Sequence, residues 1–439
     1  MSSAGDLKVK GTQLSTKIFG GILDIDNSGS SAGVELLNFV FGVKKEHMLA
    51  KDRIPDPQKY GHHIARQLAY GVDSDFEEKV SSILQGNDAQ EVLGKLFSSL
   101  QIQPPNVKKS TDSGWTRKPF FPFTETLIHW DIKKSNKSIE RVWMRGGGSL
   151  LHKILREDPN EQRLDKIRDG FSSLYALASR SALHKLAGFF RGIKKETKNI
   201  GEDTFYSVKS KPDDIESASR ANIDDFENVY RNGLLNILEH SKLTTVGKVE
   251  ALVNWSALWL AIMQYRRSCV AIGLKESAPI VCDCTVAATS VRRLARRQFQ
   301  FAFSTIKKAL DAQPEFSGLS AGQKNRICAF FPSTATAVGL INAYTGSRYY
   351  TLKVTALETI VAALVPHAEE IPFYEFVDKT IYHNLGLVVS RGAAKSSGLL
   401  EDFDGTIFEE NEQGLAIQMK ASGLLTTYSD ATQMISFRR

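Results

Sequence analysis

Cysteine is scarce in this chain, and targeting segments are missing. The 439 residues include four cysteines, too few to suggest a disulfide framework. The opening residues, MSSAGDLKVKGTQL, lack the apolar core of a secretory signal. The longest apolar stretch, ALVNWSALWLAIMQY (251–265), is shorter and more mixed than the ~18 uncharged apolar residues of a membrane span. We therefore expect a cytoplasmic protein with no membrane partner.

The chain also lacks a strong excess of either charge. It carries 56 Lys and Arg against 49 Asp and Glu, which gives a net charge of +7. Hydrophobic residues make up 42% of the sequence and charged residues 24%, which is ordinary for a folded protein and excludes global disorder. The mild basic excess is compatible with a polyanionic partner but does not require one.

No stretch supplies the side chains that a catalytic or metal site needs. Cys282 and Cys284 form a C-x-C, whereas structural zinc typically takes paired ligands about two to four residues apart. The segment IVCDC (280–284) predicts instead a buried strand with both sulfurs on one face. Glu196 and Lys198 form an E-x-K, but in a charged loop that could not hold carboxylates rigidly around an ion. We favour a protein that is not an enzyme, with no cofactor, no metal and no catalytic residue.

Apolar periodicity predicts a mainly α-helical fold with minor β-structure. Residues 88–100 carry one apolar stripe, and a long helical block is expected from about 223 to 273. Within that block, Trp255 and Trp259 lie one turn apart, as core residues would. Residues 120–132 predict a strand. The expected architecture is thus a multi-helical body with few strands.

Composition divides this fold into three parts. We expect an N-terminal helical unit with a leading strand (1–101), a central mostly helical domain (116–345) and a C-terminal unit (346–439). The leading strand is predicted over residues 7–19, where basic and apolar residues partly alternate. Residues 194–214 are charged, interrupted by Gly and Pro, and poor in apolar residues, which is typical of a mobile loop or a domain boundary.

The C-terminal unit has the element order of a winged helix. Helices are predicted at 354–364 and 372–385, then a short strand at 387–390, a third helix between Asp404 and Gly423, and a strand–turn–strand over 424–437. The winged-helix-like fold serves DNA binding in some proteins and protein contacts in others, so the fold alone does not choose between them.

The segment SVRRLARRQF (290–299) places four arginines within six residues. On a helix they span about 140° of one face, with apolar residues opposite and no acidic residue between them. Like charges one turn apart repel, whereas a phosphate backbone would supply counter-charges that suit the guanidinium group. The alternative is a solvated face, or arginines paired with carboxylates from another segment. We expect Arg292, Arg293, Arg296 and Arg297 to contact phosphates, with further positive charge at Arg266, Arg267, Lys307 and Lys308.

Two shorter segments are weaker candidates for phosphate contacts. In MRGGGSLLHKIL (144–155), Arg145 precedes a Gly-rich turn, and the amides of Gly146, Gly147 and Gly148 lead into a helix at Ser149. The segment lacks the Gly-Lys-Ser/Thr ending of a nucleotide-binding phosphate loop, and a tight turn before a capped helix is the simpler interpretation. In GSRYYTL (346–352), Arg348 stands beside two tyrosines after a glycine turn, where a backbone contact would be natural.

Several stretches together resemble a broad set of uncharacterised bacterial proteins from anti-phage defence islands, encoded beside HerA-type ATPases and restriction components. The resemblance is carried by residues 52–72, 143–171, 279–299, 346–365 and 373–431. It implies a cytoplasmic, non-catalytic subunit of an antiviral defence assembly that works with an ATPase or nuclease subunit. It transfers no catalytic residue. DNA is the favoured nucleic acid and RNA the other possibility.

Two further functions stay open. Nucleocapsid proteins of some negative-strand RNA viruses are similar in size, helical content and mild basic charge, and coat RNA without reading its sequence; they would use the same arginine helix. A chain of this mild charge is also compatible with a protein–protein scaffold that has no nucleic-acid affinity.

Overall fold

The computed structural model confirms a mainly helical fold with a few small sheets. The structure describes residues 14–23, 31–41, 47–55, 77–99, 132–134, 139–141, 147–175, 185–186, 205–207, 224–275, 277–287, 290–343 and 346–437. The chain forms two compact units, one made of residues 1–30 with 213–439 and the other of residues 31–212. The boundary near residue 212 falls within the 194–214 segment singled out by composition, while the three predicted domains remain a prediction.

The 31–212 unit combines helices with two short antiparallel pairs. In chain order it contains α2 (Ser31–Phe41), β1 (Arg53–Pro55), α4 (Glu77–Leu84), α5 (Asn87–Ser99), β2 (Ile132–Lys134), β3 (Ile139–Arg141), α6 (Gly148–Arg156), α7 (Glu161–Leu174) and β4 (Phe205–Ser207). Strand β1 pairs with β4, and β2 pairs with β3. Helix α2 packs closely on α6, and buried leucines of α6 fill the contact.

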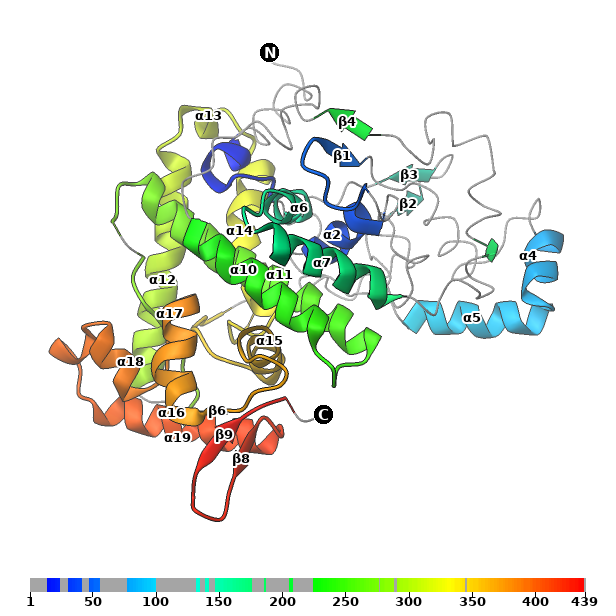
Figure 1. Cartoon of the computed structure of the whole chain (residues 1–439). Helices are drawn as coiled ribbons and strands as arrows, with labels where there is room; N and C mark the ends of the chain where they lie inside the picture. The colour runs from blue at the N-terminus through cyan, green and yellow to red at the C-terminus, as the bar shows by residue number, and fades with distance from the viewer. Residues whose placement is uncertain are drawn as a thin grey trace. The chain divides into compact units, whose positions relative to one another are not determined.

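The other unit is built around α11 (Thr245–Ala271), which packs against α10 (Asp224–Glu239), α12 (Ser290–Asp311), α14 (Ala321–Ala337) and α15 (Val354–Leu364) (Figure 1). The short α13 (Pro314–Ser317) joins α12 to α14. The indole N–H groups of Trp255 and Trp259 donate to Tyr230 O and Phe226 O on α10, at 3.1 and 2.9 Å. Both tryptophans are fully buried, which confirms their predicted place in the core.

Helix α11 is long and apolar enough to cross a bilayer by length and composition alone. Its buried side chains run around the whole helix, as in a helix enclosed by other helices, and 67% of its most apolar window is buried in the fold. A core helix passes the same test, so the helix is weak evidence for a membrane.

The C-terminal elements follow α15 in the order β6 (Ile371–Pro372), α16 (Phe373–Glu375), the π-helical turn η5 (Phe376–Thr380), α17 (Ile381–Leu385), β7 (Leu387–Val388), α18 (Arg391–Ser396), η6 (Leu399–Glu401), α19 (Thr406–Ala421), β8 (Leu425–Thr427) and β9 (Gln433–Ile435). Strands β6, β9 and β8 form an antiparallel sheet in that order. Strand β7 instead pairs in parallel with β5 (Ile280–Val281). The helices and the terminal hairpin predicted here are confirmed.

One predicted element is wrong. Residues 14–19, assigned to a leading strand, form a helical segment. Leu14 and Ile18 are buried one turn apart, a spacing that suits a helix rather than an alternating strand. Residues 7–13 and most of the predicted strand at 120–132 lie outside the described residues, although β2 begins at Ile132.

Candidate nucleic-acid interface

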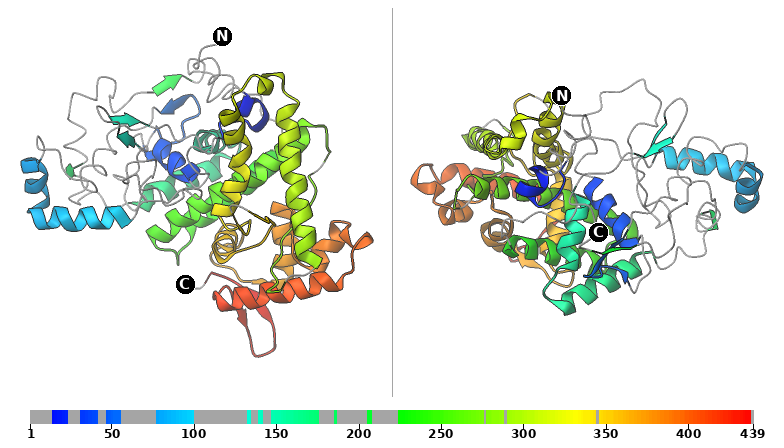
Figure 2. Two further views of the ribbon diagram at one scale, coloured as in Figure 1. Left: turned by 180° about the vertical axis from the view of Figure 1, so that it is seen from behind. Right: turned by 90° about the horizontal axis from the view of Figure 1, so that it is seen from above.

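Helix α12 separates apolar and cationic residues on opposite faces. Its backbone is the long yellow-green helix in the left view of Figure 2. Val291 and Leu294 pack into a cluster with Val281 of β5, Val388 and Phe408 of α19. This burial fixes which side of the helix turns outward. The exposed side carries Arg293, Arg296, Arg297, Gln300, Phe301, Ser304, Lys307, Lys308 and Asp311.

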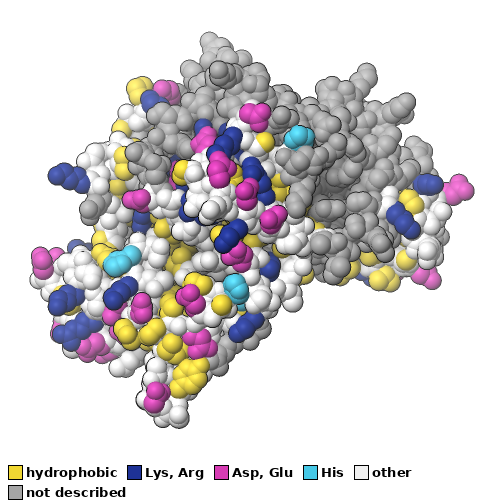
Figure 3. All heavy atoms as spheres, viewed as in Figure 1, with side chains coloured by type: hydrophobic (Ala, Val, Ile, Leu, Met, Phe, Trp, Pro, Cys, Tyr) yellow, Lys and Arg dark blue, Asp and Glu magenta, His cyan; other side chains and the backbone are white. Residues whose placement is uncertain are grey.

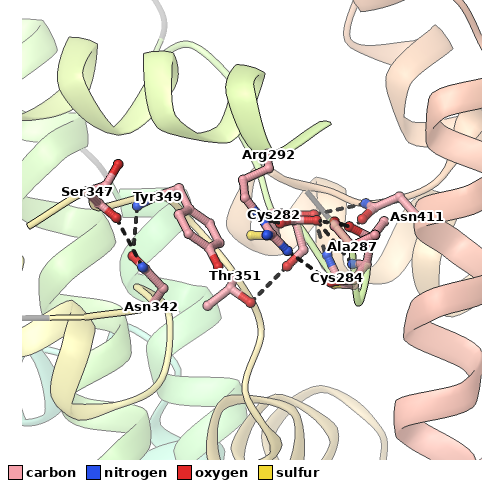
Figure 4. A network of polar contacts seen from close by, with 11 residues as sticks. Cys282, Cys284, Ala287, Arg292, Asn342, Ser347, Tyr349, Thr351 and Asn411 are labelled. Carbon is pink, nitrogen blue, oxygen red and sulfur yellow. Dashed lines mark hydrogen bonds and ion pairs between the residues drawn. The ribbon is translucent and has the colours of Figure 1, made fainter. Parts of the chain in front are cut away.

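The structure places Arg292 apart from the other three arginines. Its Nε donates to Asp283 Oδ2 at 2.5 Å, and its Nη2 donates to Thr285 O at 3.3 Å. The hydrogen bond that Arg292 donates to Asp283 raises the pKa of Arg292, and the guanidinium lies 5.1 Å from the centre of the Tyr349 ring. Figure 4 shows the side chain turned from α12 toward the 282–287 segment. Arg292 therefore has the internal carboxylate partner that the sequence left as an alternative.

The carboxylate that binds Arg292 is itself fixed by the fold. Asp283 is buried, its backbone N–H donates to Tyr350 O at 2.9 Å, and its carbonyl accepts from Thr351 Oγ1 at 2.8 Å. Its Oδ1 also accepts a hydrogen bond from Thr285 Oγ1 at 2.6 Å. Asp283 is thus a structural partner that positions the start of α12.

A buried amide side chain on α19 holds the adjoining backbone (Figure 4). Asn411 Oδ1 accepts from Cys284 N at 2.7 Å, and Asn411 Nδ2 donates to Cys282 O and Val389 O, each at 2.9 Å. These three hydrogen bonds join α19 to the segments that follow β5 and β7. The orientation of Asp283, and so of Arg292, depends on this network.

The remaining arginines of the cluster point into solvent. Arg293, Arg296 and Arg297 are exposed, and no ion pair to any of them is found among the described residues. The cationic face continues with exposed Lys307 and Lys308, and no acidic side chain lies on the helix before Asp311. From position 293 to 308 the helix rises about 22 Å. Such a stripe could follow several phosphates of one strand.

An aromatic side chain interrupts the cationic stripe near its middle. The side chain of Phe301 is 47% exposed, although its ring is large and apolar. Two residues earlier, the buried Phe299 instead stacks on Phe303 and Phe331. A half-exposed ring between cations is suited to stacking on a base, so the two kinds of contact that single-stranded nucleic acids use are both available on α12.

The GSRYYTL segment lies against the same helix. Gly346 has a φ of 83°, which a glycine tolerates, and Asn342 closes the turn by bonding to Ser347 O at 3.1 Å and Tyr349 N at 2.9 Å. The Arg348 guanidinium lies 5.8 Å from the centre of the Phe299 ring. The fold therefore brings Arg348 to the arginine helix, a proximity that sequence spacing did not reveal.

The glycine turn before α6 already binds a carboxylate of the protein. Gly147 is left-handed (φ 98°), and the Gly148 N–H donates to the buried Glu35 Oε2 on α2 at 2.7 Å. A Cβ on Gly148 would come within 2.4 Å of the Glu35 side chain. Gly148 therefore serves close helix packing, and its amide has an internal acceptor in place of a phosphate. Arg145 and Gly146 lie outside the described residues.

Two cations expected to add to the basic surface lie inside the fold. Arg267 is fully buried, with Nη2 bonded to Glu227 Oε1 at 3.0 Å and Nη1 bonded to Phe19 O. Arg266 is half-buried, with its guanidinium over the Phe226 ring. Neither contributes to the exposed face of α12.

The cysteines behave as small buried apolar residues. Cys282 and Cys284 are buried after β5, and burial raises the pKa of both thiols. Within the described part of the chain, no group of three His, Cys, Asp or Glu side chains could hold a metal ion. The predicted strand at 280–284 is confirmed only for its first two residues, because Cys284 turns away to meet α19.

Comparison with protein-family models, with curated proteins and with solved structures yields no significant match. Sequence reasoning missed the role of Asp283 and Tyr349 around Arg292; the only available signal was an Asp nine residues before an arginine, in a segment assigned to a strand.

Proposed function

We propose that this protein is a non-catalytic nucleic-acid-binding protein that contacts backbone phosphates through the exposed face of α12. The observation that carries the proposal is the group of exposed arginines at 293, 296 and 297 with no ion pair among the described residues, continued by Lys307 and Lys308. Arg348 would add a contact at the side of the helix. Arg292 is left out of the binding set because Asp283 already neutralises it.

We further propose a winged-helix-like arrangement for residues 354–437. The order helix, strand, helices and terminal hairpin supports it, as does a sheet in which β9 lies between β6 and β8. The helix before the hairpin, α19, carries Glu409, Glu410 and Glu412 in its first half. Glu409 is paired with Arg391, but the remaining acidic charge would repel phosphates, which favours a protein contact for this region and leaves the nucleic acid to α12.

A protein partner for the C-terminal elements fits the proposal of a subunit in a cytoplasmic anti-phage defence assembly, beside an ATPase or nuclease. Figure 3 shows hydrophobic side chains gathered at the lower left, around α16 and β6 above the terminal hairpin. Tyr374, Ile417 and Tyr428 are among the exposed large apolar residues here, at 62, 69 and 42% exposure. Exposed apolar side chains of this kind are enriched at protein interfaces.

The test measures binding to duplex DNA, single-stranded DNA and RNA by fluorescence anisotropy across a salt series. The variant R293Q/R296Q/R297Q is compared with K79Q/K166Q/K420Q, which removes the same charge from exposed positions elsewhere. Each lost phosphate contact lowers the slope of log affinity against log salt by roughly 0.7–0.9, so the arginine variant should lose about 2–3 in slope. The lysine variant should keep the wild-type slope.

The outcomes separate the candidate functions. No binding to any of the three polymers, or equal loss in both triple variants, would overturn the α12 interface and leave a protein scaffold. Preference for duplex DNA supports the defence subunit. Preference for RNA, together with filaments that form only on RNA, would favour a nucleocapsid.

A further inference from the structure

A cavity of about 630 Å³ lies between the end of α11, Lys275 with residues 277–280, the α17–β7 turn and the end of α18. This volume falls in the range of sites for small organic ligands and cofactors, roughly 300–1,000 Å³. The cavity is separate from the exposed face of α12, since none of the residues that line it belongs to that helix. Its function is therefore not explained by nucleic-acid binding.

The guanidinium of Arg266 reaches this cavity. Burial lowers the pKa of the Arg266 guanidinium to about 10, and no carboxylate pairs with it among the described residues. Its neighbour Arg267 shows the usual solution for a buried guanidinium, with Glu227 and a backbone carbonyl as acceptors. The absence of such a partner leaves Arg266 as the one arginine of the pair able to bind an external anion.

The surroundings orient the Arg266 side chain toward the cavity. One face of its guanidinium stacks on Phe226, with 4.0 Å from Cζ to the ring centre. A Cβ on Gly386 would lie 3.4 Å from Arg266 Nη2, and the φ of +72° at this position also favours glycine. The Phe226 ring and the Gly386 backbone hold the Arg266 guanidinium in place, and its N–H edge stays available to an acceptor.

The other residues that line the cavity also favour binding of an anion. Lys275 supplies a second cation and Tyr382 a hydroxyl group, whereas the hydroxyls of Ser396 and Ser397 donate to Gly392 O and Ala394 O in α18. No Asp or Glu is among the described residues that line the cavity, whereas Ile262, Val270, Ile280 and Leu385 give it an apolar wall. Two cations, one tyrosine hydroxyl and an apolar wall together match a ligand with an anionic end and a largely apolar body.

We propose that this cavity binds a phosphorylated small molecule of about nucleotide size, with its phosphate on Arg266 and Lys275 and its uncharged part against the apolar wall. The guanidinium fork suits two phosphate oxygens, and the lysine ammonium adds a point charge. The site lies beside Ile280, which opens β5, and so belongs to the same small parallel pair that leads to Asp283.

The test is isothermal titration calorimetry of the full chain with pyrophosphate, AMP, ADP and ATP as probes. Adenosine controls for the uncharged part and citrate for a carboxylate of similar charge. We expect binding of at least one phosphorylated probe and none of adenosine. R266M should weaken that binding about ten- to a hundredfold, the range for loss of a hydrogen-bonded charge. K420M, which removes an exposed cation on α19, should leave it unchanged.

Two further controls keep the outcome decisive. R293Q/R296Q/R297Q should keep full affinity for the probe; if it loses affinity instead, the phosphates bind to α12 and the cavity proposal is overturned. R266K keeps the charge, so it should bind between wild type and R266M even if R266M is less stable. Tighter binding of citrate than of every phosphorylated probe, or no binding of any probe to the wild type, would also overturn the proposal.

Discussion

The hydrogen bonds of Asn411 give the sharpest stability prediction. We consider N411L, which keeps a similar volume but removes the amide. The substitution leaves the Cys284 N–H and the carbonyls of Cys282 and Val389 without their partner, in a place where Asn411 itself is fully buried. An unsatisfied buried polar group costs about 1–3 kcal/mol. Three such groups, with some relaxation, predict a loss of about 3–6 kcal/mol in the free energy of unfolding.

The assay is urea unfolding followed by tryptophan fluorescence, since Trp255 and Trp259 are buried in the same unit. The control is Q413L, two residues along α19 at an exposed position, which should change the free energy of unfolding by no more than about 0.5 kcal/mol. A difference of less than about 1 kcal/mol between N411L and wild type would refute the reasoning that this amide holds the 282–284 segment.

A second variant at the same position tests the direction of the bonds. In N411D, the introduced carboxylate can still accept from Cys284 N, but its other oxygen faces the carbonyls of Cys282 and Val389. Only the protonated acid can donate to one of them, so folding raises the pKa of the new group. The free energy of unfolding of N411D should therefore fall relative to wild type as pH rises above the ordinary range of a carboxyl group. An equal loss at pH 4 and pH 8 would contradict the assigned bonds.

Three further predictions follow from burial and close packing. The pKa of His240 is lowered to about 4, mainly by burial and further by the nearby positive charges of His367, Lys248 and Lys242. The unfolded state therefore takes up the proton first, the free energy of unfolding should fall by about 2–3 kcal/mol between pH 7 and pH 4, and H240F should flatten that dependence. Among the cysteines, only Cys328 is partly exposed, so mass spectrometry after alkylation should find one modified thiol in the native protein and four in denaturant. A Cβ at Gly414 would lie 2.5 Å from Cys284 O, whereas Gly322 has open space; G414A should lower the midpoint of thermal unfolding, with a loss of about 1–3 kcal/mol, while G322A should not.

Periodicity was sufficient to predict the long helices and the terminal hairpin. The stripe at 354–364 and the block from 223 to 273 became α15, α10 and α11, because their apolar spacing reports the buried face directly. The strand predicted over residues 14–19 is wrong because the segment is short. In six residues, only one or two side chains distinguish strand alternation from helical spacing. Strand β7 was predicted, but its pairing with β5 was not. The two strands are more than a hundred residues apart, and the local sequence pattern carries no information on such a pairing.

For the arginine cluster, too, the sequence was sufficient to predict the helix but not all of its contacts. The helix and its two faces followed from the spacing of Val291, Leu294 and the arginines. The sequence could not show that Arg292 is bonded to Asp283, because that contact depends on how the segment after β5 turns. The sequence could not predict the Arg266 site either, because Arg266 and Arg267 are adjacent residues of the same type. Only the three-dimensional positions of Glu227 and of the cavity distinguish the two arginines.

Because Arg292 is paired inside the fold and Arg296 is exposed, substitutions of the two arginines should affect stability and nucleic-acid binding separately. R292Q removes the partner of the buried Asp283 carboxylate, so it should lower the free energy of unfolding while leaving the salt slope of nucleic-acid binding at the wild-type value. R296Q should do the reverse, because that side chain is exposed on the outer face of α12. Anisotropy salt series and urea unfolding on both variants measure the two effects independently. A drop in salt slope for R292Q equal to that for R296Q would mean that Arg292 leaves Asp283 to bind phosphate, and the pairing seen here would then be a resting arrangement of the free protein.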